Sequence, residues 1–233
     1  MLEKILDYER ELFFMLNGSD SVFLDHFMWL FSGKIVWLPL ALFILIVLTY
    51  KVNWRESLLV LLAIVLVVTL CDQFASHLFK PLFMRFRPTH HPAFMDEVQT
   101  VFGYRGGKYG FISSHAANAF GFAMFMTLLF RYKPLFTSTV FLWAIVTAYT
   151  RIYLGVHFIS DIVPGILVGL VFGYLVYLLY AWVRPKIVGW GGRDVPPISV
   201  VYPIRRQRLI VIAILITVIL IMLLNAQLVS MLR

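Results

Sequence analysis

Three short segments of this sequence combine basic, serine and histidine side chains in patterns suited to binding and cleaving a phosphate ester. In the first, Lys80 is separated by six residues from Arg87, which precedes Pro88. Two cations beside a rigid turn can together neutralise a phosphate dianion. The alternative is that these basic residues only snorkel at a membrane boundary.

The second segment, 110–121, indicates a loop that leads into a helix rich in small residues. Ser113 and Ser114 stand where a helix N-terminus would aim backbone N–H groups and a hydroxyl at an anion. His115, in the first turn, could give a proton to a departing oxygen. Alternatively, the serines only cap the helix and the histidine bonds at a membrane interface.

The third segment places Arg151 six residues before His157, and Asp161 four residues after it. Positions i and i+4 share a helix face, so Asp161 can accept a hydrogen bond from one ring nitrogen of His157. The other nitrogen is then free to attack phosphorus, as an oriented nucleophile. A purely structural His–Asp pair is the alternative.

The elements that position these segments are predicted to be membrane-spanning helices. Hydrophobic residues make up 61% of the 233 residues and the mean hydropathy is +0.86, which a soluble domain would not tolerate. Uncharged apolar runs predict six spans. They cover residues 35–50, 57–79, 114–130, 135–153, 159–183 and 209–232.

All three segments lie at span ends on the same predicted face of the bundle. Independent structural explanations would each have to place phosphate-suited groups there by coincidence. The joint pattern therefore favours a catalytic site.

The region before the first span predicts an amphipathic helix over residues 1–17 that lies at the membrane interface. We find no repeat, no low-complexity tract and no cleavable signal peptide. We therefore expect an all-α, polytopic membrane protein, with residues 1–233 forming one membrane-embedded domain. Its fold would be a six-helix bundle with an N-terminal interfacial helix.

Composition also argues against several classes of site. The net charge of +8 comes from basic residues scattered over short loops, so we expect a lipid bilayer and anionic headgroups as partners and no nucleic acid. Cys71 is the single cysteine, which excludes an internal disulfide. The adjacent His90 and His91 lack a third ligand at suitable spacing, so no metal and no cofactor is expected.

The distribution of basic residues predicts which way the protein is oriented in the membrane. Each predicted face carries ten of the twenty Lys and Arg residues. When the three cations assigned to the site are set aside, the face of the site keeps seven against ten. The opposite face is therefore predicted to be cytoplasmic, which places the site on the outer, periplasmic face of a bacterial inner membrane.

The stretch from Lys80 to Asp161 resembles the type 2 phosphatidic acid phosphatase (PAP2) family. The family signature reads Lys-x6-Arg-Pro, then Pro-Ser-Gly-His, then Ser-Arg-x5-His-x3-Asp, and all the spacings fit. This sequence departs from it at Ile112, Ser114 and Thr150, none of which removes a reacting group. The six-helix membrane fold of the family agrees with the span count.

The resemblance implies a role for each matching residue. His157 would form a phosphohistidine, oriented by Asp161, while His115 would act first as general acid and then as general base toward water. The phosphate would be bound by Lys80, Arg87, Arg151, Ser113 and the backbone of Ser114.

We expect a metal-independent lipid phosphatase of the bacterial membrane-bound branch. Similar proteins act on lipid A, undecaprenyl diphosphate, phosphatidylglycerophosphate or phosphatidic acid, and lipid A is the leading choice. A lipid-to-lipid phosphotransferase is the main alternative of another class. A transporter would distribute its charges along the bundle depth, and the related vanadate-dependent haloperoxidases are soluble.

Two further features remain open at this stage. Asp72 lies within the second predicted span, where an ionisable group is costly unless paired, and it could support Lys80. The alternative is that it pairs with a serine or amide of the bundle. The loop 89–110 could be a lid or a headgroup reader, or only a solvated connector.

Overall fold

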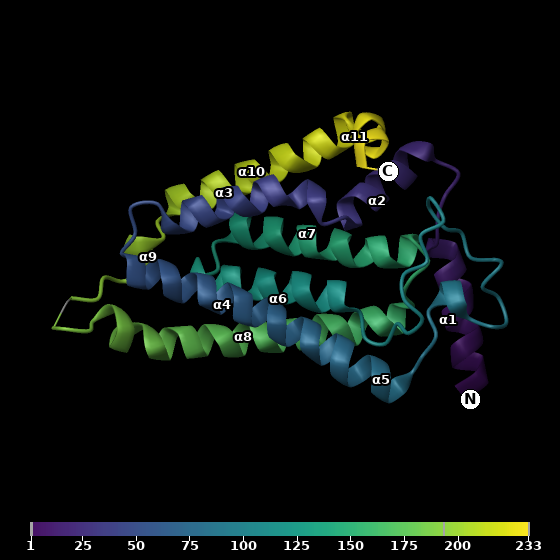
Figure 1. Cartoon of the computed structure of the whole chain (residues 1–233), viewed down its shortest axis with the longest axis horizontal. Coiled ribbons are helices and arrows are strands. Elements are labelled where there is room, and N and C mark those ends of the chain that lie inside the picture. The colour runs from purple at the N-terminus through teal and green to yellow at the C-terminus, as the bar shows by residue number, and fades with distance from the viewer. Residues whose placement is uncertain (1, 193, 233) are drawn as a thin grey trace.

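Long helices lie side by side and form the body of the protein (Figure 1). The computed structural model describes residues 2–192 and 194–232. In that part, four helical stretches are long and apolar enough to cross a membrane. They are Trp54–Phe83, α7 (Pro134–Tyr153), α8 (Ile159–Val188) and α10 (Ile204–Leu223). The predicted all-α, multi-pass membrane architecture is thus confirmed.

The first of these stretches is built from three pieces. Helix α4 (Trp54–Gln73) continues through the π-helical turn η2 (Phe74–Phe79) into the short helix α5 (Lys80–Phe83). A π-helical turn is wider than an α-helical one, so it changes the face on which the following residues point. This turn directly precedes Lys80.

The two other predicted spans have a different form. Helices α2 (Val22–Ser32) and α3 (Leu38–Thr49), joined through the 3-10 turn η1 (Ile35–Trp37), bend by 69° and give a fifth span when counted together. Helix α6 (Ser114–Leu129) has 16 residues, about 24 Å at the usual rise per residue, which is shorter than a hydrocarbon core. Twelve of its residues are buried, because its apolar side chains face other helices.

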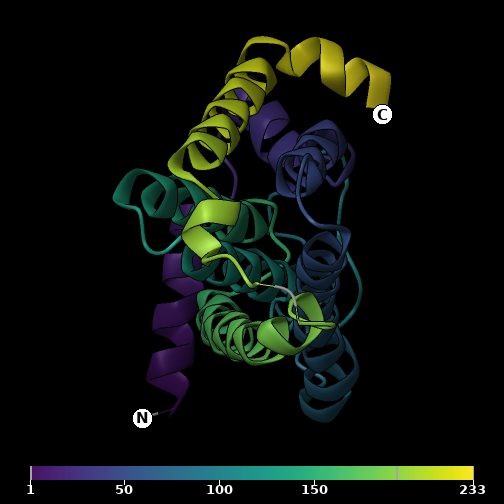
Figure 2. The ribbon, with the colours of Figure 1, turned by 90° about the vertical axis from the view of Figure 1, so that its left-hand side faces the viewer.

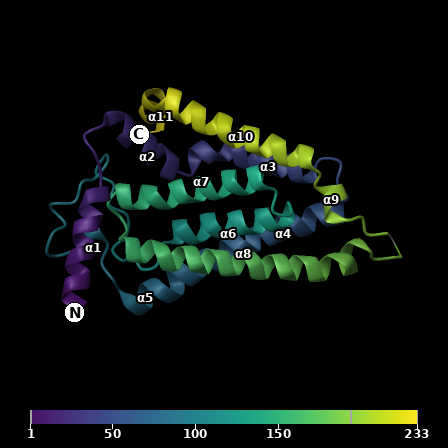
Figure 3. The ribbon, with the colours of Figure 1, turned by 180° about the vertical axis from the view of Figure 1, so that it is seen from behind.

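The two ends of the chain lie near the same end of the bundle. Helix α1 (Leu2–Leu16) crosses the ends of the long helices, which confirms the predicted N-terminal helix (Figure 3). The predicted span 209–232 is interrupted, because α10 ends at Leu223 and α11 (Asn225–Leu232) turns away from it (Figure 2). The short helix α9 (Ile198–Val201) precedes α10 at the opposite end.

Close packing of α6 on α8 fixes the two helices that carry much of the site. A Cβ atom at Gly169 would lie 2.4 Å from the carbonyl oxygen of Ala117, and one at Gly173 would lie 2.5 Å from that of Gly121. Glycines spaced four apart therefore let the two backbones meet, as in many membrane helix pairs. Where both helices begin, the backbone N–H of Ser113 donates to the carbonyl of Asp161 at 3.0 Å.

The loop between α5 and α6 folds into a narrow antiparallel arrangement. Phe86 and Tyr109 form an isolated bridge, flanked by a 3.1 Å hydrogen bond from Arg87 N to Lys108 O and a 2.9 Å bond from Gly110 N to Arg85 O. Residues two apart on an extended strand point to the same side. This pairing therefore directs Arg85 and Arg87 toward the same region. The turn η3 (Pro88–His90) follows directly.

Candidate active site

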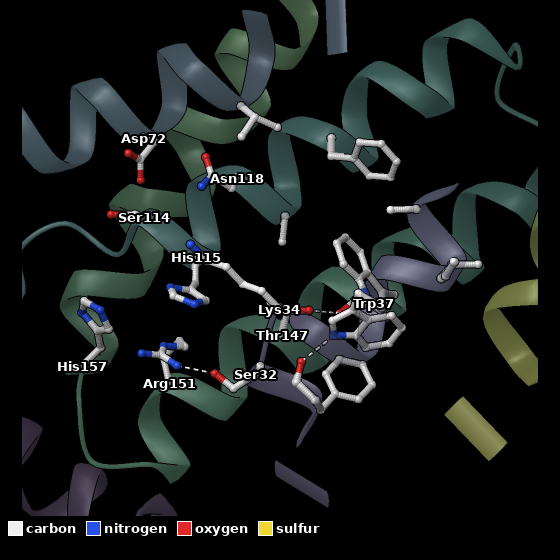
Figure 4. A pocket seen from close by; sticks show the side chains of 18 of the residues that line it. Ser32, Lys34, Trp37, Asp72, Ser114, His115, Asn118, Thr147, Arg151 and His157 are labelled. Carbon is white, nitrogen blue, oxygen red and sulfur yellow. Dashed lines mark hydrogen bonds between the residues drawn. The ribbon is translucent and has the colours of Figure 1, made fainter. Parts of the chain in front are cut away.

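A cavity of about 550 Å³ lies at the bundle end where the three sequence segments meet (Figure 4). The smaller part of its wall is polar and cationic, and the larger part is made of apolar side chains of α3, α4, α6, α7 and α10. Among the residues predicted for the site, Ser113 and Asp161 do not line the cavity. Those that line it are Lys80, Arg87, Ser114, His115, Arg151 and His157.

The predicted pair of His157 and Asp161 is present. His157 Nδ1 lies 3.3 Å from Asp161 Oδ2, and both side chains are almost fully buried. On its other side, His157 Nε2 lies 3.0 Å from Nη1 of Arg87. A guanidinium can only donate, so Nε2 is the acceptor and carries the lone pair, while Nδ1–H donates to Asp161. This is the tautomer that a nucleophilic Nε2 requires.

Burial and the neighbouring charges of Arg87 and Arg151 hold the pKa of His157 well below its usual value of 6.5. Because its pKa is lowered, the ring loses its proton at a lower pH than an ordinary histidine does. The ring is therefore neutral at pH 6.5 and above. We expect ¹⁵N NMR of histidine-labelled protein, without substrate, to show Nε2 unprotonated at neutral pH. The signal, assigned by its loss in His157→Ala, should titrate with a midpoint well below 6.5. A midpoint at or above that value would contradict this electrostatic account.

Arg151 is anchored at one end of the cavity wall. Its side chain is almost fully buried, with Nη1 donating to Ser32 Oγ and Nη2 donating to the hydroxyl of Tyr104 at 3.0 Å. Its Nε has no hydrogen-bond partner among the described residues. A buried donor without a partner is costly, and a bound anion would relieve that cost.

Arg87 is the second buried guanidinium. Besides His157, it donates from Nε to Tyr109 O and from Nη1 to Val156 O, each at 3.1 Å. Burial, followed by the charge of Arg151, lowers its pKa to about 10. It therefore stays charged at neutral pH and is held firmly by the loop backbone.

Lys80 meets the start of α6. Its Nζ donates to Ser114 Oγ at 2.7 Å and to Ser76 Oγ at 3.1 Å. Ser114, which replaces the glycine of the family pattern, thus lies in the cavity wall with its hydroxyl beside a cation. Ser113 instead caps α6, since its Oγ accepts from Ala116 N at 3.4 Å. Its role as a phosphate ligand stays a prediction.

His115 projects into the cavity from the first turn of α6, and its ring lies near His157 and Arg151 (Figure 4). From the other side, Lys34 extends toward His115 out of the bend between α2 and α3 (Figure 4). Lys34 is therefore a fourth cation of the cavity.

Sequence reasoning missed several residues that contact the predicted ones. Ser32 and Tyr104 hold Arg151, Ser76 bonds to Lys80, and Lys34 and Arg85 had been counted only as surface charges. Only the position of Arg85, two residues before Arg87, could have marked one of them, because both would share one side of an extended segment.

Asp72 and the loop 89–110, whose roles the sequence left open, both contribute to the cavity wall. Asp72 lines the cavity, but Lys80 bonds to the serines described above rather than forming an ion pair with it. Within the loop 89–110, Tyr104, Gly106 and Gly107 contribute to the cavity wall. The loop therefore covers part of the site and is more than a solvated connector.

The cations of the cavity lack acidic partners. Among residues 2–192 and 194–232, no carboxylate forms an ion pair with Lys80, Arg87 or Arg151. Buried charges are normally paired, and the missing partner of such a cluster is an anion. The arrangement can therefore bind a phosphate group beside Nε2 of His157, which carries the lone pair.

Comparisons with known proteins agree with this chemistry. The sequence profile of the PAP2 superfamily matches residues 57–185. A Lipid A 4'-phosphatase of Porphyromonas gingivalis is 47% identical over 188 residues, which cover 81% of this chain and 79% of that protein. A protein of the same name from Bacteroides thetaiotaomicron is 39% identical over 180 residues, 77% of this chain and 80% of that protein.

A solved structure supports the same fold. The transmembrane PAP2 type phosphatidylglycerolphosphate phosphatase from Bacillus subtilis superposes with a TM-score of 0.57 at 20% identity. The match covers 78% of this chain and 88% of that one. At this identity the likeness concerns the arrangement of the helices.

Proposed function

Because the chain belongs to the PAP2 superfamily and is a phosphatase of that family, we propose that it removes the 4'-phosphate of lipid A without a metal ion. The names of the two bacterial relatives support this substrate. One structural observation carries the mechanism: the buried guanidinium of Arg87 lies 3.0 Å from His157 Nε2, and no carboxylate of the described residues forms an ion pair with Arg87 or with the buried Arg151. The proposal takes residues 1–233 as one membrane-embedded phosphatase domain.

In the first step, the lone pair of His157 Nε2 attacks phosphorus and the bond from phosphorus to the sugar oxygen breaks. His115 donates its proton to that departing oxygen as general acid. The product is a phosphohistidine whose ring is cationic, because Nδ1 keeps its proton, and the carboxylate of Asp161 stabilises that charge. Lys80, Arg87 and Arg151 stabilise the charge on the transferring oxygens.

In the second step, water attacks phosphorus on the side that the leaving group has vacated. His115, now neutral, takes a proton from this water as general base. The bond between phosphorus and nitrogen breaks, and its electron pair returns to Nε2. Inorganic phosphate leaves and the starting protonation states are restored.

The shape of the cavity suits a lipid. Its cationic part accommodates a phosphate, while its larger apolar part includes Trp37, Leu40, Ile44 and Ile64 and can receive hydrocarbon. Lys34 lies between the two parts (Figure 4). Anionic groups elsewhere on the headgroup would be attracted to it, which favours a polyanionic lipid.

We further propose that the protein resides in a bacterial inner membrane with the cavity at the periplasmic face. The support is the excess of basic residues on the opposite face once the site cations are set aside. Lys80, Arg87 and Arg151 line one cavity, so setting the three aside together as site cations is consistent with the structure.

Phosphate release by purified protein in excess EDTA tests the proposed function. The panel is lipid A, undecaprenyl diphosphate and phosphatidylglycerophosphate, with lipid A that lacks the 4'-phosphate as the matched control. We expect lipid A to be the fastest substrate, the control to release no phosphate and EDTA to have no effect.

Other outcomes of this assay identify the alternatives. Faster release from another lipid would overturn the substrate, and loss of activity in EDTA would overturn the metal-free mechanism. Transfer of the phosphate to a second lipid, without inorganic phosphate, would indicate a phosphotransferase.

A further inference from the structure

Both carboxylate oxygens of Asp161 are bonded, and they are bonded to different partners. Oδ2 lies 3.3 Å from His157 Nδ1 and accepts from the backbone N–H of Phe158 at 3.1 Å. Oδ1 accepts from Nη1 of Arg85 at 2.7 Å. Asp161 is fully buried, so Arg85 supplies the positive charge that such a carboxylate needs.

Arg85 is in turn fixed by the N-terminal helix. Its Nη2 donates to Glu9 Oε2 of α1 at 2.8 Å, and the other oxygen of Glu9 accepts from Ser160 N at 3.0 Å. Nη1 also donates to Ser160 Oγ, and the guanidinium lies over the Phe158 ring at 4.5 Å. These contacts hold the guanidinium in one orientation from several sides.

Neither Arg85 nor Glu9 lines the cavity, so neither is placed to touch a substrate bound in it. Arg87, two residues further on, does line it and contacts His157 itself. The antiparallel loop thus presents one arginine to each side of the His–Asp pair. One lies beside the reacting nitrogen and the other lies behind the carboxylate.

We propose that Arg85, held by Glu9, is a positioning residue that keeps Oδ2 of Asp161 directed at His157 Nδ1. The proposal rests on the proposed function, because it assigns a role in the same reaction. By occupying Oδ1, Arg85 prevents the carboxylate from turning away and keeps it ionised opposite the cationic phosphohistidine ring. The N-terminal helix α1 then contributes to the positioning of the catalytic pair through Glu9.

Steady-state kinetics of Arg85→Met, with Arg105→Met as control, test this role. Arg105 lies exposed in the same loop and outside the cavity wall. We expect kcat of Arg85→Met to fall about 10- to 100-fold while KM changes less than about threefold, because misorientation affects the transition state more than binding. Arg85→Lys should recover part of kcat, and Glu9→Gln should lose less than Arg85→Met.

A double-mutant cycle separates positioning from general damage. In an Asp161→Asn background, Arg85→Met should lower kcat little further, since its effect passes through the carboxylate. Full additivity, or unchanged kcat in Arg85→Met and Glu9→Gln, would overturn the inference. If Arg85→Met does not fold, Glu9→Gln and Arg85→Lys carry the test. Failure of the proposed function differs, because it would show as retained turnover in His157→Ala.

Discussion

Replacing His157 with alanine is expected to lower phosphate release by at least about 10⁴-fold, to the level of the uncatalysed reaction in the assay. The reason is that the substitution removes the only group that forms a bond to phosphorus in the first step. The imidazole lies between Asp161 and Arg87, so its loss also removes a hydrogen-bond partner of each. Lipid binding should persist. The measurement is kcat on the preferred lipid, with binding followed separately.

His77→Ala is the matched control for that variant. His77 lies in the π-helical turn η2, is exposed and is not part of the cavity wall. It should keep kcat near the wild-type value. If His157→Ala kept full activity in the same preparation, the covalent mechanism would be wrong.

The second large effect is expected for Arg151→Gln, with a loss of kcat of about 10²- to 10³-fold. Arg151 is 2% exposed and held by Ser32 and Tyr104, so its charge acts in a poorly solvated environment. Losing a fixed cation there weakens the stabilisation of charge on the transferring oxygens. The kcat of Arg151→Lys should lie between those of the wild type and Arg151→Gln. An ammonium keeps the charge but cannot keep both anchoring bonds in the same geometry.

Lys186→Gln provides a charge-matched control. Lys186 lies near the end of α8 remote from the cavity, 3.3 Å from the centre of the Trp182 ring, and does not line the cavity. The control should leave kcat unchanged. If Arg151→Gln raised KM and left kcat unchanged, Arg151 would bind the substrate and the transition state equally, which would contradict this prediction.

The parts of the site that the sequence predicted are those governed by local rules. The spacing of four residues correctly predicted the contact of His157 with Asp161, although only Asp161 lies in α8 and His157 directly precedes the helix cap. Lys80, Arg87 and Arg151 were found because a charged residue at the end of an apolar span is conspicuous. Their assembly into one cavity depended on the helical membrane architecture, which is confirmed, although the described residues give four or five candidate spans where six were predicted.

The remaining parts depend on tertiary contacts that no local pattern encodes. Arg85 and Glu9 are 76 residues apart, and their bond exists only because α1 crosses the bundle end. Lys34 enters the cavity from the bend between α2 and α3, whereas the sequence predicted only a span over residues 35–50 that begins after it. Hydropathy also could not tell that α6 is a short central helix, since burial by protein and burial by lipid give the same apolar composition.

The central claim is that phosphate passes through a covalent bond to His157 Nε2. Rapid quenching of the wild-type protein with its preferred lipid, under alkaline conditions that preserve phosphohistidine, followed by peptide mass spectrometry, tests it directly. We predict a phosphorylated peptide that carries the modification on His157, appears before the release of phosphate and is absent from His157→Ala. Phosphate release at the normal rate with no modified histidine, or with the phosphate on another residue, would contradict the account.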